Sequence, residues 1–179
     1  MINSLAIGDD RLQFLYQIWL DKRRGRMMPR RADIDPLDIP GRVWPNTMIL
    51  EVVRRNSETR FRYRRAGAVF WRAVGREPTG LFVDEVVPET AGYRGYVLGI
   101  YRETLELRRP IYTENQFLLE ERVEPVTVRR VMLPLSSDGV AVDMVMTGHV
   151  FAHEELQDHW ILSHVRGLRE TVRLVLGEE

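Results

Sequence analysis

Three closely spaced aspartates, Asp33, Asp35 and Asp38, are the residues of this sequence that most resemble a metal-binding loop. Clustered carboxylates suit Ca²⁺, but a calcium loop of the EF-hand type also needs glycine at its sixth position and glutamate at its twelfth. Counted from Asp33, those positions hold Asp38 and Trp44. The segment DPLD that begins at Asp35 instead favours the capped start of a short helix, because Asp at the cap and Pro at the first position satisfy exposed amides.

Histidines are the second group of candidate metal ligands. The chain has four, all near its C-terminal end: His149, His153, His159 and His164. The first two are four residues apart, a spacing that chelates one ion on a helix. The segment around them favours a strand, where four residues span roughly 13 Å at ~3.3 Å each, too far for a single metal. We therefore expect two surface histidines on one face of a strand and no metal site.

The pair Asp143 and His149 is the one acid–base combination that we nominate for catalysis. Both residues have the same parity in the predicted strand, although Asp143 is as readily a solvated residue. Ser136 and Ser137 lie in a predicted hairpin turn, and no G-x-S-x-G sequence presents a serine for nucleophilic attack. The sequence also lacks a Walker loop and the glycine fingerprint of dinucleotide-binding proteins.

Composition excludes several further classes of function. The absence of cysteine removes disulfides, thiolate metal sites and cysteine nucleophiles, and it fits a reducing cytoplasm. The 26 basic and 26 acidic residues give zero net charge, so no long-range field attracts nucleic acid or acidic lipid. Basic pairs such as Arg54-Arg55 and Arg129-Arg130 are therefore interpreted as solvated surface, which disfavours a DNA-binding regulator. No apolar run approaches the ~20 residues of a membrane span, and the start does not resemble a signal peptide. We expect a cytoplasmic protein with no nucleic-acid or membrane partner.

The N-terminal half begins with a helix, predicted over residues 9–24 by the 3.6-residue period of its apolar side chains. Its apolar face is made of Leu12, Leu15, Tyr16 and Trp19. Two strands follow, over residues 46–55 and 59–66, with a polar turn between them. Residues 67–89 mix short helical pieces with turns, because their Gly and Pro residues forbid one long helix.

A longer helix is predicted over residues 89–109 and ends before Pro110. Gly92, Gly95 and Gly99 fall on one side of it, and each costs up to ~1 kcal/mol relative to Ala inside a helix. A close approach of that side to another backbone or to a ligand would compensate for this cost; the alternative is a loosely wound first turn. Three strands follow, over residues 110–121, 126–136 and 140–153, and Asp138-Gly139 between the last two is a strong hairpin signal.

The tail is predicted to form a further helix over residues 156–176. Its apolar residues Ile161, Val165, Leu168, Val172 and Val175 keep a 4-3-4-3 spacing, which resembles a coiled-coil seam. A short helix of this kind either packs on its own sheet or pairs with a partner. Helices grouped between two sets of strands indicate an antiparallel α+β domain. The expected organisation is an N-terminal amphipathic helix over residues 1–25, a domain over 26–155 and a C-terminal helix over 156–179.

Four sequence stretches, in this order, are similar to those of PAS domains. They are MMPRRADIDPLDIP (27–40), FRYRRAG (61–67), GREPTG (75–80) and LPLSSDGVAVD (133–143). Together they resemble the bacterial subfamily of small, largely single-domain PAS proteins, with Glu77-Pro78 as one departure where Asp and an apolar residue are typical. The resemblance implies a five-stranded antiparallel sheet with short helices on one face, flanked by N-terminal and C-terminal helices. It also implies that the Asp-Pro segment is the connector that turns the first helix toward the first strand.

A PAS fold would leave space between its helices and sheet for haem, flavin or a small organic molecule. A flavin photoadduct needs a cysteine, which this chain lacks. Haem needs an axial ligand, usually His, and none of the four histidines falls in the longer helix, where a haem-binding PAS relative would carry it. The remaining candidate is a small apolar ligand among large aromatics and adaptable methionines. The pocket candidates are Phe70, Trp71, Ile100, Tyr101, Phe117, Met132, Met144 and Met146, which would otherwise simply fill the core.

The resemblance and the amphipathic ends together predict a cytoplasmic sensory or signalling module without catalytic activity. It would act by forming a homodimer or by docking on an unidentified signalling protein, with or without a ligand. The interface candidates are Leu12, Leu15, Tyr16, Trp19, Ile161, Val165, Leu168 and Val172. The alternative is a small cone-shaped α+β enzyme, of the isomerase or dehydratase kind, that uses Asp143 and His149.

Overall fold

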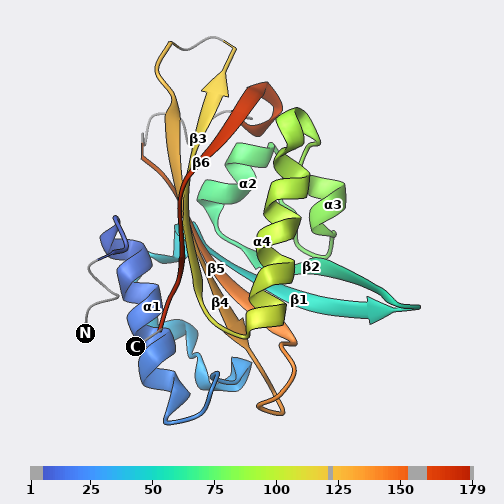
Figure 1. Ribbon diagram of the computed structural model, residues 1–179. Coiled ribbons are helices and arrows are strands. Elements are labelled where there is room, and N and C mark those ends of the chain that lie inside the picture. Colours follow the sequence, from blue (N-terminus) through green and yellow to red (C-terminus); the bar gives the residue numbers. More distant parts are fainter. Residues whose placement is uncertain (1–5, 121–122, 153–160, 178–179) are drawn as a thin grey trace.

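A six-stranded antiparallel sheet forms the centre of the molecule, with helices on both of its faces (Figure 1). The computed structural model of the chain describes residues 6–120, 123–152 and 161–177. The strands are β1 (Thr47–Arg55), β2 (Glu58–Ala66), β3 (Ile111–Leu119), β4 (Val126–Leu135), β5 (Met144–Phe151) and β6 (Val165–Val175), in the spatial order β2-β1-β5-β4-β3-β6. The helices are α1 (Asp10–Arg23), α2 (Ala68–Val74), α3 (Val83–Val86) and α4 (Tyr93–Leu107). Short 3-10 turns occupy Arg31–Asp33, Pro36–Asp38, Trp44–Asn46, Thr90–Gly92 and Ile161–His164.

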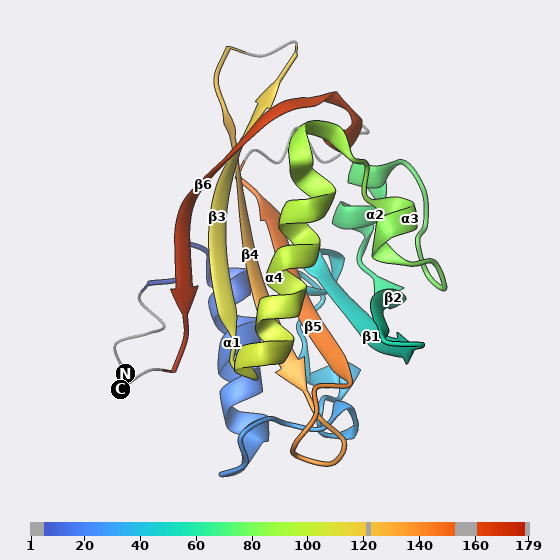
Figure 2. The same ribbon diagram turned by 45° about the vertical axis from the view of Figure 1, so that its right-hand side comes forward.

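The two faces of the sheet carry different helices. Figure 2 shows α4 crossing one face beside α2 and α3, while α1 lies behind the other. The antiparallel α+β class is therefore confirmed, as are the helix over residues 9–24 and the existence of the five strands predicted between residues 46 and 153, of which residues 121 and 153 lie outside the described residues. Strand β5 begins at Met144, later than predicted, because Asp138 Oδ1 accepts hydrogen bonds from the amides of Val140 and Ala141 and holds them in the loop.

The predicted C-terminal helix is wrong for every residue of the tail that the structure describes. Residues 165–175 form β6, which pairs antiparallel with β3 and makes the sheet six-stranded instead of five-stranded. Strand pairing outweighs helix formation here, because the backbone N–H and C=O groups at the open edge of β3 need hydrogen-bond partners. The three valines of this segment and Thr171 also favour a strand.

Two register shifts in β6 explain why its sequence resembles a helix. One lies near Arg166 and the other near Thr171. Each shift reverses the parity of the strand, so Val165, Leu168 and Val175 pair with β3 residues of the same face although their spacing is three and seven. The apparent 4-3-4-3 period thus comes from an irregular strand. Val172 pairs with Glu114 on the opposite face, and Ile161 lies in a 3-10 turn, so no helical seam exists in this segment.

Helix α1 packs on its own sheet. Asp9 caps its start, where the side chain accepts a hydrogen bond of 2.9 Å from the Arg11 amide. The interface candidates Leu12, Leu15, Tyr16 and Trp19 are all buried inside the chain. The Trp19 indole also donates a 2.7 Å hydrogen bond to the carbonyl of Pro134 on β4. These four side chains therefore belong to the core and are not available to a partner in this structure.

Gly148 on β5 is required by the close approach of α1. A Cβ at this position would lie 2.4 Å from Leu12 Cδ2 and 2.8 Å from Leu15 Cδ1. Both distances are shorter than a van der Waals contact, so only glycine lets the helix approach this closely.

The three aspartates of the connector serve structure. Asp33 accepts a 2.8 Å hydrogen bond from the Arg30 amide, and Asp35 accepts one of 2.8 Å from the Leu37 amide. Asp38 forms an ion pair with Lys22 at the end of α1. The segment therefore turns the chain from α1 toward β1, as predicted.

The glycines of α4 do not mark a close approach. Gly95 and Gly99 are exposed, and an added Cβ would meet no atom within 4 Å at either position. Gly92 precedes the helix with φ at +74°, in the left-handed region. The expected compensation by close packing is therefore absent, and α4 has a low intrinsic stability for its length.

Candidate functional site

Arg130 is a charged side chain in the interior of the domain. It is 2 % exposed and projects from β4 toward α4, on the same face as Met132. Its cross-strand neighbours are Thr113 on β3 and His149 on β5, so three polar residues form one row across the sheet. Directly opposed residues in a sheet have Cβ atoms about 4.5–5.5 Å apart. With Asn115, two residues from Thr113, this row is called the Arg130 cluster below.

Neutral groups hold the guanidinium of Arg130. It donates one hydrogen bond to Asn115 Oδ1 and another, of 2.8 Å, to the hydroxyl of Tyr93 at the start of α4. The rings of Tyr93 and Phe117 lie 5.4 Å and 6.0 Å from its central carbon. These two rings meet edge to face at 5.0 Å and close the space around the charge.

Within the described part of the chain, the Arg130 charge has no acidic partner. Its interactions there are the hydrogen bonds and ring contacts above and a third ring contact, with Tyr96 at 6.0 Å, and no carboxylate of these residues lies within ion-pair distance of it. A buried charge is costly unless it is paired, and an unpaired arginine inside a core is uncommon. Most of the five N–H donors of the guanidinium remain unused.

Unpartnered polar atoms surround this charge. Thr113 Oγ1, Asn115 Nδ2 and both ring nitrogens of His149 are buried and have no hydrogen-bond partner among the residues that the structure describes. The Tyr96 hydroxyl on α4 is also without a well-formed hydrogen bond, although Thr113 and Glu170 lie nearby. Each buried polar group left unpaired costs ~1–3 kcal/mol. Because several such groups lie together, this part of the core lowers the free energy of unfolding, and a molecule that paired with them would raise it.

His149 lies between two aromatic rings. The centroids of Phe70 and Phe151 are 5.7 Å and 4.7 Å from that of the imidazole. Burial lowers the pKa of His149 well below 6.5, and the positive charge of Arg130 lowers it further. The imidazole is therefore neutral at pH 7, and the prediction of a surface histidine is wrong. His153 lies outside the described residues.

A second hydrogen-bonded chain lies next to the Arg130 cluster under α4. Tyr101 and Thr147 have their hydroxyl oxygens 3.3 Å apart, and the Thr147 hydroxyl contacts Met132 Sδ at 3.3 Å. Burial raises the pKa of Tyr101 far above its usual value, so its hydroxyl keeps its proton at neutral pH. The hydroxyls of Tyr101 and Thr147 therefore have hydrogen-bond partners, unlike the unpartnered polar atoms of the Arg130 cluster.

The pocket candidates fall into two groups. Phe70, Ile100, Tyr101, Phe117 and Met132 are buried between the helices and the sheet. Trp71 is 37 % exposed on α2, and the remaining two methionines belong to the opposite face of the sheet: Met144 and Met146. Five of the eight residues are thus brought to the same layer as the Arg130 cluster.

Sequence reasoning missed the Arg130 cluster. Arg130 belongs to the pair Arg129-Arg130, which was interpreted as solvated surface. The sequence did hold one signal. Val128, Arg130 and Met132 are two residues apart in a predicted strand, so they share one face, and the neighbours of Arg130 on that face are apolar. Thr113 and Asn115 share a face of β3 in the same way. Nothing in the sequence shows that this face is the one covered by α4.

Asp143 and His149 do not form a dyad. They are separated by six residues of extended chain, roughly 20 Å at ~3.3 Å per residue. Asp143 Oδ2 accepts a 2.7 Å hydrogen bond from the Ser137 amide at the far end of β5. The geometry therefore gives no support to an enzyme that uses this pair.

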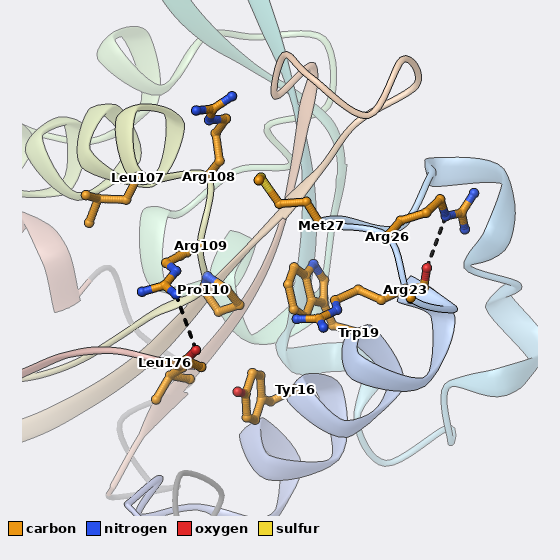
Figure 3. A pocket seen from close by; sticks show the side chains of 12 residues that line it. Tyr16, Trp19, Arg23, Arg26, Met27, Leu107, Arg108, Arg109, Pro110 and Leu176 are labelled. Carbon is orange, nitrogen blue, oxygen red and sulfur yellow. Dashed lines mark hydrogen bonds between the residues drawn. The ribbon is translucent and has the colours of Figure 1, made fainter. Parts of the chain in front are cut away.

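A surface pocket of about 310 Å³ lies at the seam between α1, the corner after α4 and the end of β6 (Figure 3). Several arginines rim it, but backbone carbonyls occupy their donors: Arg26 donates to Arg23 O at 3.1 Å, and Arg109 donates to Gly177 O at 3.4 Å. Arg23 stacks over Trp19 at 5.5 Å. These contacts hold three elements together, and the pocket has no buried unpartnered group like those around Arg130.

Comparison with known proteins agrees with this architecture. The family model of the PAS domain matches residues 9–151, from α1 to the end of β5. The chain belongs to the PAS domain family. PAS domains are generally sensory or signalling modules and are usually without catalytic activity. No protein of curated function matches the chain.

The matched residues contain the whole Arg130 cluster, whereas β6 lies outside them. No group of three or more potential metal ligands occurs among the residues that the structure describes. Within the same residues, no helix is long and apolar enough to cross a membrane.

Proposed function

We propose that this PAS domain is a sensory module that binds a small molecule between α4 and the sheet and passes the signal on by associating with another protein. The observation that carries the proposal is the Arg130 cluster. As far as the structure describes the chain, a buried charge without a counter-ion lies beside Thr113, Asn115 and His149, each of which has an unpartnered polar atom. These protein groups are already removed from water, so a ligand that supplies their missing partners would add little desolvation cost on the protein side.

Helix α4 is suited to admit such a ligand. It covers the Arg130 cluster through Tyr93, yet its exposed Gly95 and Gly99 gain nothing from packing. Each glycine weakens the helix by up to ~1 kcal/mol relative to alanine. Elements that move on ligand binding are drawn from the less stable parts of a fold. A ligand that changes the position of α4 would also change the surface that α4 presents to a partner.

The output of the module is association, either with a second copy of the chain or with a separate signalling protein. The apolar face of α1 cannot provide that surface in this structure, because Leu12, Leu15, Tyr16 and Trp19 are buried. Strand β6 and α4 are joined by an ion pair between Arg173 and Glu103, so a movement of α4 reaches the edge of the sheet. Sedimentation over a concentration series, with and without ligand, tests this step: a ligand-dependent change in association supports it, and identical sedimentation in both states contradicts homodimerisation as the output.

Ligand binding itself is tested by native mass spectrometry of the purified protein, followed by thermal denaturation with a panel of small acids, amides, amines and neutral aromatics. We expect a bound mass in the first measurement or a saturable rise in melting temperature in the second. A domain that carries no added mass and responds to no class of compound would refute the sensory proposal.

A further inference from the structure

We propose that the molecule bound between α4 and the sheet is a small organic monocarboxylate, whose carboxylate group pairs with Arg130. This inference rests on the proposed function, because it names the chemical class of the ligand at that same site. It is argued from three properties of the cluster: its free donors, its charge and the side chains around it.

Hydrogen-bond donors dominate the unsatisfied groups. Asn115 Nδ2 is a pure donor, the Thr113 hydroxyl can donate, and neutral His149 carries one N–H. Arg130 uses two interactions with neutral acceptors and keeps further N–H groups free. A carboxylate offers two oxygens with about four acceptor sites and fits the planar fork of a guanidinium. A cationic or donor-rich ligand could pair only with the acceptor nitrogen of His149 and the Thr113 oxygen, and it would leave the donors of Asn115 and Arg130 unpaired.

The charge of the cluster selects a monoanion. Arg130 contributes one positive charge, and His149 is held neutral by its burial. At the outer end of the row, Arg173 and Glu170 of β6 lie opposite Thr113 and Asn115; they pair with each other, and Arg173 also pairs with Glu103. Within the described residues no carboxylate pairs with Arg130 itself, so one carboxylate of a ligand would supply its missing counter-charge. A phosphate group, with about −1.5 to −2 charge at pH 7, would leave an uncompensated negative charge in the interior.

The surroundings of the cluster select an organic acid with a short apolar part. Phe70, Phe117 and Met132 border the polar row from the same side of the sheet. Flat rings and flexible thioethers pack well against small aromatic or aliphatic groups. Arg130 is almost fully covered in the closed structure, so a ligand needs α4 to move, and a small acid needs the least movement.

The test measures the affinity of the complete chain for butyrate and benzoate, with butyramide and benzamide as uncharged compounds of matched shape. Thermal denaturation and calorimetry are performed in chloride-free buffer at constant ionic strength. Saturable binding of at least one acid, with an affinity at least tenfold higher than that of its amide, is the expected result. Equal responses to acid and amide, or no response to either acid, would overturn the assignment of a monocarboxylate.

Variants place the acid at Arg130. Arg130→Gln should weaken binding of the acid at least tenfold. Arg129→Gln, one residue away on the opposite face of β4, should change it less than twofold. Without acid, Arg130→Gln should melt no lower than the wild type, because it removes an uncompensated buried charge. With acid present, the wild type should melt higher than Arg130→Gln. Unchanged affinity in Arg130→Gln excludes the pairing.

Thr113→Val provides a second variant of matched shape, which keeps the test valid if Arg130→Gln does not fold. It removes an unpartnered hydroxyl, so we expect an unchanged or higher melting temperature without acid and weaker binding of the acid. Binding as tight as in the wild type would contradict the site. A neutral compound that binds under α4 independently of Arg130 would refute the carboxylate and preserve the sensory function, whereas the absence of any ligand would refute both.

Discussion

Arg129 and Arg130 show how one step along a strand changes the physics of a side chain. Arg129 projects toward the α1 side of the sheet, where Glu114 lies 3.2 Å from it and water still reaches both groups. Arg130 projects toward α4 and meets two neutral acceptors and three aromatic rings. The first arginine makes an ordinary surface ion pair, worth little. The second arginine has no negatively charged partner among the described residues, so binding of an anion beside it would be favourable.

The protonation of His149 makes stability depend on pH. In the unfolded chain its pKa is near 6.5, and burial beside Arg130 lowers the folded value well below that. Between these values only the unfolded chain binds the proton. The free energy of unfolding should therefore fall as pH drops below 6.5, by up to ~1.4 kcal/mol per pH unit from this residue, and level off above it.

His149→Leu isolates this contribution in urea denaturation at pH 7.5, 6.5 and 5.5. The variant should be as stable as the wild type or more stable at pH 7.5, because it removes two unpartnered nitrogens. Its advantage over the wild type should grow as pH falls. A difference between the two proteins that stays constant over this range would show that His149 is not buried as a neutral group.

At the scale of elements, α1 is a core helix. Leu15 is completely buried on it, so Leu15→Ala should lower the free energy of unfolding by about 2–5 kcal/mol, the range for large-to-small changes in a core. The loss should be the same at low and high protein concentration. Urea midpoints at two concentrations measure it, and a loss that appears only at high concentration would instead place Leu15 in an interface between copies.

Two glycines make a matched pair for the contact between α1 and the sheet. Gly148→Ala places a methyl group against Leu12 and Leu15 and should destabilise the domain by about 1–3 kcal/mol through overpacking. Gly99→Ala adds a methyl group to an exposed position of α4 and should stabilise it by up to ~1 kcal/mol. Thermal denaturation of the two variants should give shifts of opposite sign. If both variants shifted the melting temperature in the same direction, either the tight packing at Gly148 or the open surroundings of Gly99 would be wrong.

Most elements could be predicted from the sequence because their periodicity is local. Strand β2 alternates Phe61 and Tyr63 with arginines, and α1 repeats its apolar residues every turn. Strand β6 could not be recognised, because its two register shifts erase the alternation and its partner β3 lies about fifty residues away. The candidate site was missed for a similar reason. The row of Thr113, Arg130 and His149 is created by strand pairing, which no local pattern reveals.

At the scale of the whole molecule, β6 completes a sheet whose PAS core ends at β5. Removing residues 161–179 should lower the melting temperature and increase self-association, because the backbone groups of β3 would then be open to another chain. Light scattering and sedimentation of the shortened chain measure this. Arg169→Ala, which shortens an exposed side chain and keeps the strand, is the control and should behave like the full chain. A shortened chain that stays monomeric would show that the β3 edge is protected in another way.

The position of β6 along the chain also matters during synthesis on the ribosome. Strands β1 to β5 and their helices emerge first and can begin to pair, because domains start to form from their N-terminal side. The outer edge of β3 stays without a neighbour until more than forty further residues have been added, as the pairing of residues 111–119 with 165–175 requires. Translation thus passes through an interval in which nascent chains on neighbouring ribosomes expose the same unpaired edge, and the rate at which residues 120–175 are added sets how long that interval lasts.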